Sequence, residues 1–213
     1  MHPAELISAA TASIVRAVAG FALAVVLGTV VGFAVGAVRP VRRVVSPLLY
    51  GFQALPAAAL VPFALLWFDH GSAAMYAVVV AGSAPAIAAG AVTGFDHTSP
   101  AVRQAGVALG ARGVTLLRRV LLPAAVPAYL NGLKGGWAFA WRALMSAELI
   151  VAATTRDGGL GVLLSRAGRH GDLPLMITSV LAILAVGLLV EVVALEPLER
   201  RVLVRRGLVA ARA

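Results

Sequence analysis

The chain has 213 residues, of which 61% are hydrophobic and only 13% are charged, and its mean hydropathy is +0.94. Soluble domains average about a quarter charged residues, so this composition excludes an ordinary soluble protein and indicates an integral membrane protein. The sequence contains no cysteine, which excludes a disulfide framework. The formal net charge of +9 raises nucleic-acid binding as a possibility, and the distribution of that charge decides the question.

Long apolar runs predict the membrane-spanning helices. The candidate spans cover residues 17–38, 44–68, 71–95, 124–153 and 173–190, the last continuing in apolar residues through Leu195. A helix needs roughly 20 residues to cross the hydrocarbon core of a bilayer. The sequence therefore predicts an all-α integral membrane protein with about five transmembrane helices, in a single domain covering residues 1–213.

The basic residues predict the orientation of these spans. Twelve of the eighteen basic residues fall in three clusters, which are Arg39, Arg42 and Arg43; Arg103, Arg112, Arg118 and Arg119; and Arg200, Arg201, Arg205, Arg206 and Arg212. Five crossings place all three clusters on one side of the membrane. Because positive residues mark the cytoplasmic face, the N-terminus is expected outside and the C-terminus inside. The charge is thus a signal of topology and does not indicate a nucleic-acid partner.

Glycine and proline residues predict how the first three spans pack. One helical face of the first span carries Gly20, Gly28, Gly32 and Gly36. Small residues let helices approach closely in lipid, so this face is expected to pack inside the bundle or against another subunit. The second and third spans contain Pro56, Pro62 and Pro85. These prolines predict bent helices, either around a transport pathway or as plain structural kinks.

The polar segment 96–123 lies between the third and fourth spans. Ser99 and Pro100 are a good helix start, and Gly110 stands where a left-handed residue would end a helix over 101–109. A second short helix is expected over 113–122, stopped by Pro123. The segment therefore predicts a compact knob whose tip carries small residues, namely Ala105, Gly106 and Ala108.

The spacing within this segment resembles the signature loop of the membrane subunit of ABC importers. That pattern runs Glu-Ala-Ala, three residues, Gly, nine residues, Ile, any residue, Leu-Pro. Here Gln104, Gly106 and Val120 replace the Glu, the second Ala and the Ile. The resemblance implies that the segment is a cytoplasmic coupling loop that docks on an ATPase subunit. The residues expected to form it are Arg103, Gln104, Ala105, Gly106, Leu109, Gly110, Ala111, Arg112 and Pro123.

Further segments are similar to the nitrate, sulfonate and taurine branch of these permeases. They are residues 55–68, 132–142, 147–150 and 158–161. The resemblance implies a bacterial inner-membrane location within the lipid bilayer, a second permease copy, and an external substrate-binding protein. Many members of the branch carry an additional N-terminal span. Gln104 removes a charge from the loop, which is expected to weaken contact with a basic partner residue.

The chain is not expected to be an enzyme, because the only lysine, Lys134, follows Leu133 and no phosphate-binding loop is present. ATP and magnesium would be used by the partner ATPase, and no cofactor or metal is expected on this chain. The implied substrate is a small anion such as a sulfonate or nitrate. A betaine or choline importer permease and a passive channel or scaffold are the alternative functions.

The fourth span carries the candidate residues of the substrate pathway, Arg142, Glu148 and Trp141. Ionisable side chains inside the membrane are costly and usually line a cavity or pair with each other. The guanidinium of Arg142 suits an oxyanion, although it could instead bond to backbone carbonyls. Glu148 could instead bind helix termini or loop amides, and Lys134 is expected to extend to the membrane surface.

Overall fold

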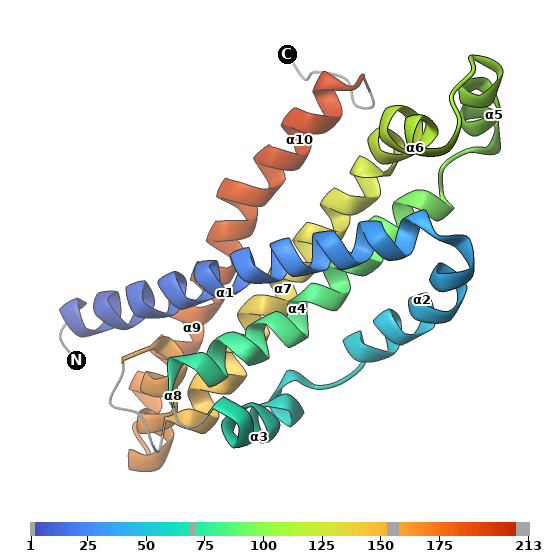
Figure 1. Cartoon of the computed structure of the whole chain (residues 1–213). Helices are drawn as coiled ribbons and strands as arrows, with labels where there is room; N and C mark the ends of the chain where they lie inside the picture. Colours follow the sequence, from blue (N-terminus) through green and yellow to red (C-terminus); the bar gives the residue numbers. More distant parts are fainter. Residues whose placement is uncertain (1–2, 69–70, 153–157, 208–213) are drawn as a thin grey trace.

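The computed structural model describes residues 3–68, 71–152 and 158–207, and every regular element among them is helical (Figure 1). The long helices are α1 (Pro3–Ala37), α4 (Ser72–Asp96), α7 (Leu122–Val151) and α9 (Leu173–Val190). Helix α9 continues through a π-helical turn, η2 (Glu191–Leu195), into α10 (Glu196–Arg205). The predicted all-α membrane fold is therefore confirmed.

Small residues bring α1, α4 and α7 into direct backbone contact. A Cβ added to Gly28 of α1 would lie 2.7 Å from the carbonyl oxygen of Ala84, and one added to Gly36 would lie 2.2 Å from the ring of Phe95. The predicted glycine face thus packs inside the chain, on α4. Because residue numbers rise together along this contact, α1 and α4 run parallel.

Helices α4 and α7 cross in the opposite sense. A Cβ added to Gly90 would lie 2.5 Å from the Cα of Gly132, and one added to Gly94 would lie 2.6 Å from the Cβ of Ala125. Residue numbers rise on α4 as they fall on α7, so these two helices are antiparallel. Leu144 of α7 is fully buried within the resulting core.

The second predicted span is a broken helix. It consists of α2 (Arg39–Gln53) and α3 (Ala57–Phe68), whose axes are bent by 97° across residues 54–56. Pro56 explains the break, because proline disfavours helical geometry in the residue before it. Since α1 and α4 are parallel, the chain between them must return across the bundle. The α2–α3 pair is therefore the fifth crossing.

This arrangement gathers the three arginine clusters at one end of the bundle, as predicted, with Arg212 outside the described residues. The same end carries α5 (Pro100–Ala108), α6 (Gly113–Leu116) and α10, while the N-terminus, α3 and α8 (Leu160–His170) lie toward the other end (Figure 1). We refer to the end that carries the arginine clusters as the arginine-rich end.

Two boundaries differ from the prediction. Helix α1 begins at Pro3 instead of residue 17, and its 35 residues make it about 52 Å long, well beyond a bilayer core. The segment 154–172, between the fourth and fifth predicted spans, contains α8, and its residues 154–157 lie outside the described residues. Helix α8 ends at His170, and Gly171, which follows it, has φ +65°.

Candidate functional site

The first half of the knob forms as predicted, with α5 within one residue of the expected bounds. The Ser99 hydroxyl accepts a hydrogen bond from the Ala101 amide at 3.3 Å. Gly110 has φ +84°, and its amide donates to the Val107 carbonyl at 2.9 Å, while the Ala111 amide donates to the Gly106 carbonyl at 2.9 Å. These two bonds are those of a Schellman motif, so the left-handed glycine fixes where α5 ends.

The exposed surface of α5 and of Leu109 after it is largely apolar. Leu109 is 89% exposed, and Gln104, Ala105 and Ala108 are exposed beside it. Gly106 differs from the prediction, because it is buried instead of lying at the tip. A Cβ at that position would lie 2.9 Å from Val120 Cγ2, so Gly106 is the point where α5 packs on the following segment.

The prediction that Pro123 stops the second short helix is wrong. The chain runs from α6 through a π-helical turn, η1 (Leu117–Leu121), directly into α7, with Pro123 in the first turn of α7. The Leu122 amide donates to the Leu117 carbonyl, five residues earlier. The π-turn changes the hydrogen-bond register just before a residue that has no N–H, so the helix continues past the proline. The loop is thereby joined rigidly to α7.

Helix α10 and the residue after it are bonded to the first half of α7. The Lys134 ammonium forms an ion pair with Glu199 Oε2 at 2.9 Å, and Arg206 Nη1 donates to the Pro123 carbonyl. Lys134 was expected only to extend to the membrane surface, and the structure shows that it pairs with the carboxylate of Glu199. The C-terminal helix therefore stabilises the part of α7 that follows the knob.

Arg142 lies at a cavity of about 360 Å³ beside the break between α2 and α3. Its Nε donates to the Ala138 carbonyl at 3.0 Å, and its guanidinium carbon lies 4.7 Å from the centre of the Phe139 ring. The side chain is exposed, and among the described residues it has no acidic partner. The two terminal nitrogens of Arg142 thus remain available to an anion, while Nε makes the backbone bond that was the alternative interpretation.

Glu148 is fully buried and its carboxylate is saturated with donors. It accepts from the Ser13 hydroxyl at 2.8 Å and from the Gly161 amide at 3.0 Å, and it pairs with Arg16 at 3.1 Å. The loop-amide alternative therefore describes its geometry. Sequence reasoning missed Ser13 and Arg16, because their distance of more than 130 residues from Glu148 gives no local signal.

Trp141 also lies inside the bundle and does not line the Arg142 cavity. Its indole Nε1 donates to the Ile183 carbonyl at 3.1 Å, which fastens α7 to α9. Gly187 leaves room for it, since an added Cβ there would lie 2.9 Å from the indole nitrogen. Of the three candidate pathway residues, Arg142 lines this cavity, while Glu148 and Trp141 are buried in contacts with other helices.

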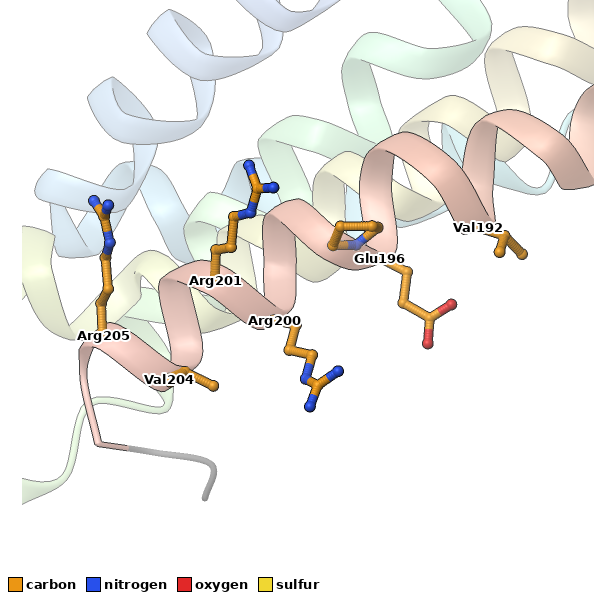
Figure 2. Close-up of a pocket in the computed structure, with 7 residues that line it drawn as sticks. Val192, Glu196, Arg200, Arg201, Val204 and Arg205 are labelled. Carbon is orange, nitrogen blue, oxygen red and sulfur yellow. The ribbon is translucent and has the colours of Figure 1, made fainter. Parts of the chain in front are cut away.

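A groove of about 560 Å³ runs along α10 at the arginine-rich end (Figure 2). Arg201 and Arg205 point to one side of the helix, and Arg200 points to the other. The groove lies on a single helix and is open, so it marks a charged surface and encloses nothing.

Comparisons with known proteins identify the family of this chain. The family described as "Binding-protein-dependent transport system inner membrane component" matches residues 6–202. A probable ABC transporter permease protein of Brucella melitensis is 30% identical over 187 residues, covering 88% of this chain and 74% of that one. The taurine transport system permease protein TauC of Escherichia coli is 30% identical over 190 residues, covering 89% and 67%.

Two further proteins are more distant. The bicarbonate transport system permease protein CmpB of Synechococcus elongatus is 27% identical over 180 residues, covering 84% of this chain and 64% of that one. A chain of the MetNI methionine ABC transporter, in an inward-facing conformation, shares the fold with a TM-score of 0.76 at 22% identity, covering 95% of this chain and 99% of that one. A family match over nearly the whole chain, with relatives at 30% identity, shows that this protein belongs to the binding-protein-dependent inner membrane components, the permease subunits of ABC importers.

Proposed function

We propose that this ABC importer permease passes a small oxyanion, of the sulfonate or bicarbonate class, and that ATP is hydrolysed by a partner subunit docked on residues 96–123. The observation that carries the substrate class is Arg142, an exposed guanidinium at a cavity beside the broken α2–α3 span. Arginine offers a planar pair of donors that matches an oxyanion. The names of two relatives, for taurine and bicarbonate transport, support the same class.

The cavity argues against a betaine or choline substrate. A quaternary ammonium is held by the faces of several aromatic rings. Here the face of Phe139 is already covered by the Arg142 guanidinium, whose positive charge would repel such a cation. An anion gains from the same charge, so the electrostatics of the cavity favour the anionic class.

The docking role rests on the shape and exposure of the knob. An exposed leucine, Leu109, stands beside small residues on α5, which suits insertion into a groove of another protein. Because α6, η1 and α7 are continuous, displacement of the knob moves the helix that carries Arg142. Closure of an ATPase pair would in this way switch a permease pair between outward-facing and inward-facing states. An external binding protein would deliver the substrate, with the arginine-rich end in the cytoplasm and the N-terminus outside.

The test of docking is Gly110→Val, with Gly168→Val as its matched control. Valine at φ +84° is strongly disfavoured, so the end of α5 would be misshapen while the spans still insert. Gly168 lies in α8 at the other end of the bundle, and an added Cβ there meets no atom within 4 Å. We expect ATPase copurification and uptake to fall only in Gly110→Val, at equal membrane abundance. Normal ATPase binding and parental uptake in Gly110→Val would show that this loop does not dock.

A further inference from the structure

Two cavities of opposite character lie in the wedge between α1, α2 and α4. The deeper one is a groove of about 340 Å³ lined only by apolar residues, among them Val31 of α1, Phe52 of α2 and Ala84 of α4. The second is a cavity of about 620 Å³ at the arginine-rich end, lined by Arg39, Arg42, Asp96 and Arg103 among others.

The two cavities are stacked along the same helices. On α1 the groove reaches Val31 and the basic cavity begins at Gly36, while on α4 they reach Ala88 and begin at Phe95. At 1.5 Å per residue the separations are about 8 Å and about 10 Å along the helix axes. The basic cavity therefore lies above the groove, nearer the membrane surface.

The charges of the upper cavity leave two cations available. Arg42 is occupied, because its Nε pairs with Asp96 Oδ1 at 3.0 Å and its Nη1 donates to the Gly36 carbonyl at 3.0 Å. This pairing also neutralises the only carboxylate among the lining residues. Arg39 and Arg103 have no ion-pair partner in the part of the chain that the structure describes. Two guanidinium groups facing one cavity are suited to a phosphate group.

We propose that an anionic phospholipid occupies this wedge, with its phosphate between Arg39 and Arg103 and one acyl chain in the apolar groove. Guanidinium groups bind phosphate by charge-assisted hydrogen bonds, and basic pockets at the cytoplasmic membrane surface recognise anionic headgroups. A free phosphate would leave the groove empty, and a zwitterionic lipid would bring a second positive charge toward the arginines. The head and tail of an anionic lipid match the two cavities together.

A second copy of the chain is a poorer occupant of the wedge. A second copy seated in the wedge would place its own arginine-rich end directly against Arg39 and Arg103, which charge repulsion opposes, so we expect the permease pair to meet on another face. The lipid instead adds negative charge beside Arg39 and Arg103. It would contact both the start of α2 and Arg103 of the knob, and so anchor the knob to the membrane surface.

The experiment is native mass spectrometry of the detergent-purified complex of permease and ATPase, titrated with dioleoyl phosphatidylglycerol, dioleoyl phosphatidylcholine or inorganic phosphate. The test variants are Arg39→Gln in the basic cavity and Ala81→Phe in the groove. The matched control is Arg43→Gln, an exposed arginine on the same helix that does not line the cavity. All three variants are first checked for a parental melting temperature without added lipid, and a variant that fails is replaced by Arg39→Ala or Ala81→Leu.

We expect one phosphatidylglycerol per permease chain, bound more tightly than phosphatidylcholine. Loss of one arginine near the surface should weaken phosphatidylglycerol binding about five-fold in Arg39→Gln and leave Arg43→Gln unchanged. Filling the groove in Ala81→Phe should weaken binding of the lipid. Equal effects of Arg39→Gln and Arg43→Gln, equal binding of the two lipids, or binding of inorganic phosphate as tight as that of lipid would each overturn the proposal. Absence of bound lipid from a dimeric permease would do so too, because a second copy would then fill the wedge.

Discussion

The buried carboxylate of Glu148 holds three segments that are remote in the sequence. It joins α7 to Ser13 and Arg16 of α1 and to the start of α8, through the Gly161 amide. The substitution Glu148→Ala removes all of these contacts at once and leaves Arg16 without this carboxylate. Removing one partner of a buried ion pair costs about 3–5 kcal/mol. For a chain of this size, that corresponds to a fall in Tm of roughly 6–20 °C.

The assay is thermal unfolding of the purified permease in detergent, with Thr178→Ala as the control. Thr178 is on α9, and its hydroxyl donates only to the Pro174 carbonyl of its own helix, so its loss should change the free energy of unfolding by less than about 0.5 kcal/mol. If Glu148→Ala and Thr178→Ala unfold within about 1 °C of each other, the carboxylate does not hold these segments together.

A second substitution tests the same contact from the other side. A Cβ added at Gly159 would lie 2.6 Å from the Glu148 carboxyl group, although the backbone there is extended and any residue can adopt it. Gly159→Ala should therefore lower the melting temperature in the parent chain. It should do much less in the Glu148→Ala background, because the obstructing carboxyl group is then absent. Additive effects of the two changes would contradict this account of the contact.

Three other predictions follow from the packing and the proposed pathway. Arg142→Gln should lower oxyanion uptake per assembled complex about ten-fold or more, with ATPase binding unchanged, and unchanged uptake would remove Arg142 from the pathway. Gly90→Val should reduce the amount of folded permease in membranes, since its Cβ would lie 2.5 Å from the Cα of Gly132, and parental abundance would contradict that contact. Single cysteines at Arg112 and Arg166 should be accessible from opposite sides of the membrane. A thiol reagent outside intact cells should label Arg166→Cys and not Arg112→Cys, and labelling of Arg112→Cys from outside would contradict the predicted orientation.

Local patterns were enough to predict much of the fold. Apolar length gave the spans, and the capping residues Ser99 and Gly110 gave α5 to within a residue. The parity of the crossings placed the arginine clusters at one end. Helix α8 was missed although the sequence contains a signal for it. Leu160, Leu163 and Ala167 recur at helical spacing, and Gly171 follows the last helical residue.

Other features depend on contacts that a single sequence does not reveal. Gly106 reads as a small surface residue, and only its packing against Val120 shows that it joins the two halves of the knob. The side-chain partners of Glu148, Ser13 and Arg16, lie on the helix α1, so no spacing rule could have named them. Whether Arg142 faces a cavity depends on the direction of α3, which the bend at Pro56 decides.

The π-turn before Pro123 bears on how the number of residues in this helix sets the direction of the knob. A π-turn contains one residue more than the α-helical turn it replaces. Deleting one of residues 117–121 would let this turn close as a regular α-helix and leave the knob in nearly its present direction. Deleting one residue from the regular helix of α7 instead would turn everything before it by about 100° and draw it in by about 1.5 Å. After such a deletion in α7, the exposed side chain of Leu109 would point in another direction, although the knob would keep all of its residues. The direction in which this permease presents the knob therefore depends on the number of residues in the helix behind it. A shorter helix would turn the knob away from its partner without removing any residue of the knob.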